Sequence, residues 1–424
     1  MPTFPLYREV YAFYLQRSAF ELRTGAKAAH YRANLLIRVV SAGRSLLGNL
    51  IHWRRGRGMQ SLGVKGKRWV VAGSRNEENT TAFLLADERY VQVPANVYQT
   101  RFPSVAVNWF PRPKMAYLGH YLPFFLRVFR EQPSLFRYLI QILVHGTGCL
   151  ENQRAVLREY RPELIVLSND HYTFTRALAV AARLEGIPTV YLPHAPIVTD
   201  FPPLIFDLSL LEGEDSYRKY TDDGKEVRGE VRLIGSPKYD VFRDRVNQGS
   251  EIHRIGIPYG FFEDPAVVVE TAKRILSAFP ELTVTLRKHP RDERPSPATP
   301  PGIHWSDAKA EDALTYLSNQ DVILATDTGI HLEAALMNVS SFYGPFLAPG
   351  RQLSDGYGFI ENGLVEVVPT VEVFLAVVRR QRRDRPSVLH RADFYVKDAG
   401  GKLSSDLAFA AIDELATTSV RTKE

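Results

Sequence analysis

Residues 322–335 read Val-Ile-Leu-Ala-Thr-Asp-Thr-Gly-Ile-His-Leu-Glu-Ala-Ala, an apolar run, a polar turn and then apolar residues at helical spacing. This pattern is typical of a buried parallel strand that leads into a helix. A hydroxyl and a glycine at such a turn expose backbone N–H groups at the start of the helix, where these groups and the helix dipole can hold a diphosphate. Glu333, further along, can accept hydrogen bonds from ribose hydroxyls. A plain helix cap at Thr328 is the alternative.

The same alternation of apolar runs and helical segments recurs along the chain, and it predicts parallel sheets covered by helices. Two successive sets of such units predict an α/β fold with two Rossmann-like domains. The expected strands of the first half are 69–72, 90–93, 164–167, 189–192 and 231–234, and those of the second half are 255–257, 282–286, 322–325, 341–343 and 365–367.

The domain boundary is expected between residues 239 and 254, where 247–250 form a polar linker. A chain of 424 residues with 45% apolar and 24% charged residues fits two globular domains. We expect a basic amphipathic arm (1–66), an acceptor domain (67–246), a nucleotide-donor domain (247–400) and a C-terminal helix with a tail (401–424).

The composition also indicates a compartment. A single cysteine, Cys149, excludes intramolecular disulfides and fits a reducing environment. The sequence starts without a signal peptide and contains no run of about 18 apolar residues that could cross a membrane. We therefore expect a cytoplasmic protein. If its N-terminal arm lies on a membrane, it would be peripheral on the inner face of the cytoplasmic membrane.

The basic charge is concentrated in the arm, because residues 1–68 carry 13 Lys and Arg against two Glu. One face of a helix there is apolar and the opposite face is polar. Two arrangements stay open: a helix lying in an anionic membrane surface, or a helix packed on the domain with its basic side in water. Nucleic acid is not an expected partner, since no basic patch with interleaved aromatics recurs in the body. The apolar face comprises Leu36, Val39, Val40, Leu46, Leu47 and Leu50, and the polar face Arg38, Ser41, Ser45 and Asn49.

Polar residues follow several expected strands, and ligands bind beyond the carboxyl ends of strands in such sheets. The segment 287–291, Arg-Lys-His-Pro-Arg, brings cations and an imidazole to one strand end, which suits a phosphate-bearing leaving group. A solvated basic loop is the alternative. His289 is the candidate catalytic residue here, and the candidate donor-binding residues are Arg287, Lys288, Pro290, Thr326, Asp327, Thr328, Gly329, His331, Glu333, Gly256 and Tyr259.

In the first domain, His194 follows the strand 189–192, and its ordinary pKa suits a base that deprotonates an acceptor hydroxyl. Glu212 and Asp215 are competing candidates, although their segment also has the form of an acidic turn that starts a helix. Asn169 and Asp170 follow the strand 164–167 and are the candidate acceptor-binding residues.

No metal or cofactor is expected. No set of His, Cys and Asp residues has ligand spacing, and protein cations stand where a magnesium ion would otherwise act. Gly-x-Gly-x-x-Gly, Walker and Gly-x-Ser-x-Gly motifs are also absent from the sequence, so the usual signs of dehydrogenases, kinases and α/β-hydrolases are missing.

With these segments in view, the sequence resembles the GT-B superfamily, in particular CDP-glycerol glycerophosphotransferases and bacterial capsule polysaccharide transferases. The resemblance implies an α/β fold of GT-B-like form, with two Rossmann-like domains facing a central cleft. It also implies that His194 is the base, that His289 binds the donor phosphate and that Thr328 contacts it too. Ala195 and Gly329 depart from the family pattern, which has a glycine and a second hydroxyl there. The matching segments are 193–195, Gly235-Ser-Pro-Lys-Tyr-Asp240, 288–290, 326–329 and 333–335.

The sequence thus predicts a metal-independent glycosyltransferase. Its donor would be a CMP-, UDP- or similar nucleotide sugar, and its acceptor a hydroxyl of a bacterial capsule or envelope polysaccharide or of a lipid-linked acceptor. The alternatives are a CDP-alditol phosphotransferase, a hydrolysing UDP-sugar 2-epimerase that releases nucleotide without an acceptor, and a binding protein without turnover.

Overall fold

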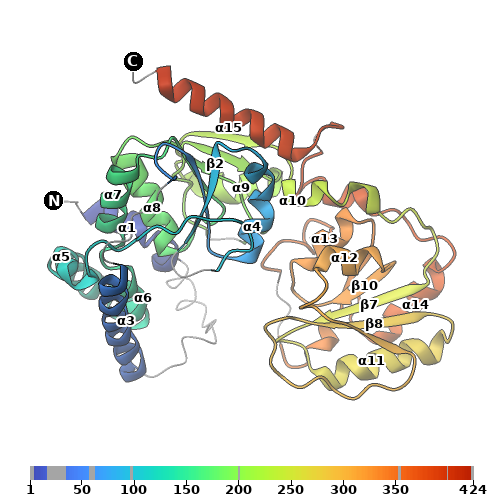
Figure 1. Ribbon diagram of the computed structural model, residues 1–424. Helices are drawn as coiled ribbons and strands as arrows, with labels where there is room; N and C mark the ends of the chain where they lie inside the picture. The colour runs from blue at the N-terminus through green and yellow to red at the C-terminus, as the bar shows by residue number, and fades with distance from the viewer. Residues whose placement is uncertain are drawn as a thin grey trace. The chain divides into compact units, whose positions relative to one another are not determined.

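The computed structural model describes residues 4–16, 35–56, 63–95, 99–198, 201–351, 355–398 and 400–421 (Figure 1). The chain divides into two compact units. Unit 1 comprises residues 1–195, 200–238 and 399–424, and unit 2 comprises 196–199 and 239–398. The division after Lys238 lies ahead of the expected boundary at 246, and the C-terminal helix belongs to unit 1. Each unit is built on a six-stranded sheet.

The sheet of unit 1 is parallel throughout, with the strand order β2-β1-β3-β4-β5-β6. Its inner strands are fully buried, which explains why they appear as continuous apolar runs in the sequence. The five expected strands are confirmed. The sixth, β5, lies in an apolar segment that was not predicted to be a strand. The bounds are β1 Arg68–Ala72, β2 Tyr90–Pro94, β3 Ile165–Leu167, β4 Thr189–Tyr191, β5 Leu208–Leu211 and β6 Glu230–Leu233.

Helices cover this sheet, and the last of them comes from the far end of the chain. Helix α15 packs Ala408 and Ile412 against the sheet core, while Asp413 forms ion pairs with Arg68 and Arg89. The helices of unit 1 are α1 Phe4–Val10, α3 Leu35–Gly56, α4 Arg75–Thr81, α5 Leu118–Glu131, α6 Pro133–Gly146, α7 Cys149–Tyr160, α8 Thr173–Leu184, α9 Glu214–Thr221 and α15 Ser404–Arg421; α10, Pro237–Asp240, spans the division between the units.

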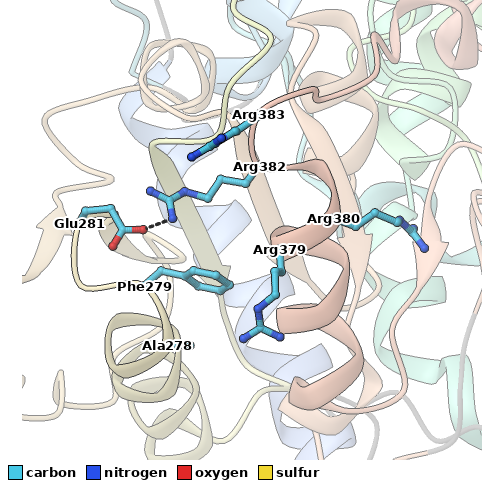
Figure 2. A pocket seen from close by; sticks show the side chains of 7 residues that line it. All are labelled: Ala278, Phe279, Glu281, Arg379, Arg380, Arg382 and Arg383. Atoms are coloured by element: carbon cyan, nitrogen blue, oxygen red, sulfur yellow. Dashed lines mark ion pairs between the residues drawn. The ribbon is translucent and has the colours of Figure 1, made fainter.

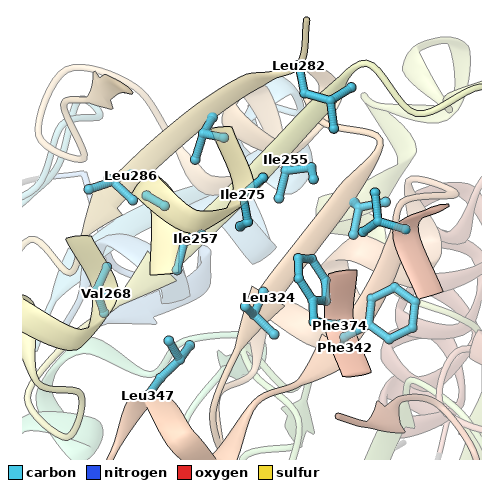
Figure 3. Close-up of a cluster of buried hydrophobic side chains, with 14 of the residues drawn as sticks. Ile255, Ile257, Val268, Ile275, Leu282, Leu286, Leu324, Phe342, Leu347 and Phe374 are labelled. Carbon is cyan, nitrogen blue, oxygen red and sulfur yellow. The ribbon is translucent and has the colours of Figure 1, made fainter. Parts of the chain in front are cut away.

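The sheet of unit 2 is also parallel, with the order β12-β11-β10-β7-β8-β9. Aliphatic side chains of β7 and β8 pack with α11 and with Phe342 and Phe374 to form its core (Figure 3). The five expected strands are confirmed, and the exposed edge strand β9 was missed. The elements are β7 Arg254–Tyr259, α11 Pro265–Ala278, β8 Thr283–Lys288, β9 Ile303–Ser306, α12 Ala313–Ser318, β10 Val322–Ala325, α13 Ile330–Leu336, β11 Ser340–Tyr343, β12 Glu366–Val367 and α14 Val371–Gln381.

The strand orders identify where ligands bind. In unit 1 the chain begins at β1 and places β2 on one side and β3 on the other, so the order reverses between β1 and β3. In unit 2 it reverses between β7 and β10. Ligands of open parallel sheets bind outside the carboxyl ends of the strands at this reversal. These two strand pairs therefore define the edges at which the candidate site is sought.

Helix α3 corrects one expectation about the arm. Its polar side, not its apolar side, faces the protein: Arg38 and Ser45 bond to α6, and Asn49 is buried. The helix is thus packed on unit 1, as one of the two arrangements had it, but Arg38 faces the protein and only Arg44 and Arg54 of its basic residues are described as exposed. Contact with a membrane stays a prediction. Within the described residues, no helix is both long and apolar enough to span a bilayer.

Candidate functional site

His194 lies just beyond β4, next to the carboxyl end of β3. Its Nδ1 donates a hydrogen bond of 2.5 Å to the carbonyl oxygen of Ser168, which directly follows β3. Because a carbonyl oxygen can only accept, Nδ1 carries the proton, and the lone pair of a neutral ring is then on Nε2. This is the form of histidine that can take a proton from a substrate hydroxyl.

The surroundings of His194 keep it neutral near pH 7. Burial lowers its pKa, and the bond to the Ser168 carbonyl and the charge of Glu77 oppose that shift only in part. The ring of His171 lies nearby, with its centroid 6.4 Å away. The sequence-based expectation of a base at this position is therefore compatible with both the tautomer and the protonation state.

Asp170, expected to bind the acceptor, is buried beneath the turn after β3. Its carboxylate accepts hydrogen bonds from the hydroxyl of Tyr220 at 2.5 Å and from His171 Nδ1 at 3.3 Å. Burial alone would raise its pKa, but these hydrogen bonds and the charge of Arg176 lower it overall. Asp170 thus holds His171, which stands between it and His194.

Asn169, the other candidate acceptor residue, is 1% exposed. Its Oδ1 accepts hydrogen bonds from the N–H groups of His171 and Tyr172 and from the hydroxyl of Thr175. The side chain therefore shapes the turn that carries His171. Contact with an acceptor remains a prediction for both Asn169 and Asp170.

Glu77 is a buried carboxylate that the sequence analysis missed. It lies after β1, across the strand reversal from Ser168, and is 1% exposed. One of its oxygens accepts from the Ser74 hydroxyl at 3.0 Å and the other from the Gly73 N–H at 2.9 Å. Ser74-Arg-Asn-Glu77 has the form of a capping box, which was the available signal in the sequence.

The two competing base candidates have partners in their own part of unit 1. Glu212 accepts a hydrogen bond from Ser236 at 2.8 Å. Asp215 forms an ion pair with Lys219 at 2.7 Å, and burial raises its pKa. These contacts favour the interpretation of an ordinary acidic turn at the start of α9.

At the strand reversal of unit 2, Glu263 connects the ends of β7 and β10. This carboxylate is 5% exposed and accepts hydrogen bonds from the Gly260 N–H at 2.7 Å and from the Thr326 hydroxyl. Arg294 donates to the carbonyls of Gly260 and Glu263 and so braces the same loop. Glu263 is not among the residues predicted from the sequence, because it stands four residues beyond the strand.

His289 directly follows β8, beside this loop. Its backbone N–H donates to the carbonyl of Tyr259 at 2.8 Å, and its Nδ1 accepts from the backbone N–H of Arg291 at 3.2 Å. The proton of the neutral ring is therefore on Nε2, the opposite tautomer to that of His194. Burial and the charge of Arg291 lower its pKa, so the free protein offers a neutral N–H donor here.

Two cations expected next to His289 bind elsewhere. Arg287 is 6% exposed and donates to the Ser306 hydroxyl at 2.6 Å and to the Glu311 carbonyl at 2.7 Å. Lys288 donates to the carbonyl of Arg294 at 2.6 Å. Both side chains therefore hold neighbouring loops in place. The exposed residues of this segment are Pro290 and Arg291.

The turn after β10 has accessible and buried members. Thr328 and Gly329 are partly exposed, and a Cβ on Gly329 would have no neighbour within 4 Å, so the missing family hydroxyl leaves open space. Asp327 and Glu333 face Tyr357, whose pKa is raised first by burial and then by their charges. Among the remaining candidates, Tyr259 is buried at the end of β7 and Gly256 lies beneath the hydroxyl of Tyr316.

The side chain of His331 is buried beneath this turn and stabilises it through hydrogen bonds. It is 1% exposed, its Nε2 donates to the Thr326 carbonyl at 2.7 Å, and its Nδ1 accepts from the hydroxyl of Ser341. Burial lowers its pKa to about 4. Donor contact by this side chain stays a prediction that the burial does not favour.

The depressed pKa of His331 predicts acid sensitivity. In the unfolded chain the histidine takes up a proton below about pH 6.5, whereas the folded chain excludes it until about pH 4, so stability is present above the unfolded pKa and is lost as the pH falls. The expected loss at pH 4 is about 3 kcal/mol. Urea unfolding across this range should show a smaller pH dependence for His331→Gln, whose amide can still donate to Thr326, than for wild type. A substitution of the exposed His304 should leave the dependence unchanged; an unaltered slope in His331→Gln would contradict the assignment.

Two cavities lie outside these strand ends. One, of about 440 Å³, is lined in unit 2 by four arginines of α14 and the following turn, with Phe279 and Glu281 (Figure 2). It adjoins the end of α11, hence the amino-terminal edge of the sheet. The other, of about 360 Å³, is lined in unit 1 by Tyr172, which directly follows His171, and by Phe174 at the start of α8, among other residues. Across the described ranges, no three His, Cys, Asp or Glu side chains are grouped to hold a metal ion.

Comparison with known proteins shows which enzymes share this fold. The sequence matches no protein family model, and no curated protein matches it either. Among solved structures, the protein is similar to UDP-GlcNAc 2-epimerase from Neisseria meningitidis bound to UDP-GlcNAc (13% identity, 82% of this chain and 100% of that one, TM-score 0.52). It is similar to Staphylococcus aureus MnaA with UDP (12%, 83% and 97%, 0.52) and to the glycosyltransferase of kitacinnamycin (14%, 82% and 99%, 0.50).

Nearly the whole length of each of these chains aligns with the present protein, which contains two doubly wound parallel sheets. The protein therefore has the α/β fold of the GT-B superfamily, as the resemblance of its motifs implied. At this level of identity the likeness shows the fold, and the function has to be argued from the strand-end residues.

Proposed function

We propose that the protein is a GT-B glycosyltransferase that moves a sugar from a nucleotide sugar to an acceptor hydroxyl. The observation that carries the proposal is the pair of opposite tautomers at the strand ends. His194 has its Nδ1 bound to a carbonyl and a lone pair on Nε2, whereas His289 has its Nδ1 occupied as an acceptor and a proton on Nε2. A transfer reaction needs both a base for the acceptor hydroxyl and a hydrogen-bond donor for the departing phosphate.

The chemistry assigned to each residue follows from these forms. His194 Nε2 takes the proton of the acceptor hydroxyl as its oxygen forms a bond to the anomeric carbon. The bond from that carbon to the donor phosphate breaks, and the electron pair leaves with the nucleotide diphosphate. His289 Nε2–H donates to a phosphate oxygen and stabilises the charge that develops on it. The turn 326–329 offers further donors to the same diphosphate.

UDP is the nucleotide to test first, because two similar solved structures are described with UDP or UDP-GlcNAc. At a hundred-fold excess over Kd, a ligand that binds only the folded state stabilises it by about 2.7 kcal/mol. We expect UDP to raise the melting temperature by about 5–10 °C at that excess. CMP, CDP and GDP serve as the comparison set, and a response to CDP alone would favour the CDP-alditol phosphotransferase. No response to any nucleotide would contradict the proposal.

A hydrolysing UDP-sugar 2-epimerase is the second candidate, since similar solved structures are described as UDP-GlcNAc 2-epimerases. The two functions differ in their need for an acceptor. An epimerase of this type releases UDP from UDP-GlcNAc with water alone, whereas a transferase releases nucleotide at a substantial rate only when an acceptor is added. Measuring UDP release with and without acceptor glycans separates them.

Independence from divalent metals is also part of the proposal. Arg287 and Lys288 hold neighbouring loops, so the groups offered to a diphosphate at this strand end are the neutral N–H of His289 and the exposed cation of Arg291. We expect turnover to persist in EDTA and not to increase with added magnesium or manganese. Activity that is lost in EDTA and restored by either ion would overturn this part.

The acceptor is proposed to be a bacterial capsule or envelope polysaccharide or a lipid-linked precursor, used by a cytoplasmic protein at the membrane surface. The aromatic cavity beside Tyr172 adjoins the turn that carries His171. It offers a place for an apolar part of such an acceptor. Transfer to lipid-linked oligosaccharides and to free oligosaccharides should be compared with the same nucleotide sugar.

A further inference from the structure

Helix α3 attaches to unit 1 through its polar stripe. Arg38 donates to two main-chain carbonyls of α6, those of Arg137 and Tyr138, at 3.2 Å each. Two turns later, Ser45 bonds to Nδ1 of His145, near the end of α6, at 3.0 Å. These polar contacts tie successive turns of α3 to the same neighbouring helix.

The same stripe continues along the helix. Asn49 is 8% exposed and accepts a hydrogen bond from the backbone N–H of Lys114 at 2.8 Å, and Trp53 donates from its indole to the carbonyl of Pro111 at 2.9 Å. Ala42, 5% exposed, completes the spacing of three and four residues that marks one face of a helix. The orientation of α3 is thus fixed by contacts spread over most of its length.

The opposite stripe is apolar and exposed. A surface helix of a globular protein normally turns its apolar stripe inward and its polar side to water, so α3 has the reverse arrangement. Single exposed apolar residues are common, but a run along one helix indicates a surface that another phase or molecule covers. The exposed side chains on this opposite stripe are Leu36, Ile37, Val40, Leu47 and Ile51, each between 46% and 67% exposed.

The basic residues that lie within this stripe favour an anionic occupant. Arg44 and Arg54 are exposed on α3, and the helix contains no Asp or Glu. A second copy of the chain on this stripe would bring like charges together, which is unfavourable. An anionic bilayer instead offers both an apolar phase and negative headgroups.

We propose that α3 is a docking surface for an anionic membrane and lies in the plane of the interface, with its apolar stripe in the lipid. Its 22 residues span about 33 Å, which is a long line of contact for an interfacial helix. The inference rests on the packing of α3 and is independent of the proposed chemistry, since it concerns where the protein works and not which bond it transfers.

The test is sedimentation of the full chain with vesicles of phosphatidylcholine, with and without phosphatidylglycerol. We expect binding only to the anionic vesicles. The triple variant Leu36→Ser, Leu47→Ser, Ile51→Ser should bind at least about ten-fold more weakly, because each lost side chain would have been buried in lipid. Val241→Ser is the matched control, because Val241 is an apolar residue of unit 2 that is 74% exposed.

The charge contribution is tested separately. Arg44→Gln with Arg54→Gln should weaken binding to anionic vesicles by about 5-fold per cation removed, and added salt should reduce the difference. Arg380→Gln, in α14 of unit 2, is the control. Unchanged binding of the triple variant, with an unchanged melting temperature, would overturn the proposal. So would a wild-type protein that ignores both vesicles but changes from dimer to monomer on the triple substitution, because the stripe would then be a self-association surface.

Discussion

Replacement of His194 by alanine is expected to lower turnover by about 10²- to 10⁴-fold, the usual effect of losing a general base. Binding of the nucleotide should remain within about two-fold of wild type, a change worth less than 0.5 kcal/mol. The reason is that the imidazole holds a lone pair on Nε2, which serves the acceptor hydroxyl and not the donor phosphate. Single-turnover rates and nucleotide affinity, measured on the same preparation, give the two halves of the prediction.

The variant His194→Asn makes this test sharper. Its amide N–H can take over the Nδ1 hydrogen bond to the Ser168 carbonyl and so keep the turn intact, but it supplies no base. It should be as inactive as the alanine variant and melt at the wild-type temperature. The exposed His120 in the same unit provides a control substitution. Near-normal turnover of folded His194→Asn would place the base elsewhere and make Glu212 and Asp215 the next residues to replace.

Replacement of His289 by alanine should weaken nucleotide binding by about 10- to 100-fold, because a hydrogen bond to a charged group contributes about 1.5–3 kcal/mol. His289→Gln should retain much of the affinity, since a glutamine amide can place an N–H close to the position of Nε2. The corresponding His194→Gln should not recover turnover. This contrast follows from the two tautomers.

Titration with UDP followed by calorimetry measures these affinities, and His304→Ala in the neighbouring strand is the control for His289. If glutamine at position 289 binds no better than alanine, the ring acts by another route than its Nε2–H. Equal loss of affinity in the His194 and His289 variants would contradict the assignment of separate roles.

The strands were predictable because parallel strands covered on both faces are short apolar runs, and Val70, Val166 and Val322 are fully buried. Strand β9 escaped prediction for the opposite reason. It lies at the sheet edge, and its central residues His304 and Trp305 are exposed. No apolar run marks such a strand.

The site residues show a similar limit. A histidine that directly follows a strand is easily placed at the sheet edge from sequence, as for His194 and His289. Glu77 and Glu263 stand further along the chain, and only the turn brings their carboxylates back to the strand end. The position of Arg287 in the sequence does not show where its guanidinium lies, because the long side chain reaches Ser306 at the end of β9 and Glu311 in the loop that follows. Its contact with a donor stays a prediction.

Helix α3 shows that an amphipathic pattern gives the width of the apolar stripe but does not tell which side of the helix packs against the protein. For α3 that choice depends on hydrogen-bond acceptors provided by residues about a hundred positions away, such as the carbonyl of Tyr138. Local periodicity contains no information about them.

The return of α15 to unit 1 has a consequence for how the chain is synthesised. Unit 2 is formed by a nearly continuous stretch, 239–398, whereas unit 1 needs residues from both sides of it. On the ribosome, unit 2 can therefore complete its core while the sheet of unit 1 still lacks the helix that buries Ala408 and Ile412. Unit 1 is therefore the first to begin and the last to be completed. Until α15 has been synthesised, the apolar surface that this helix covers is exposed to chaperones.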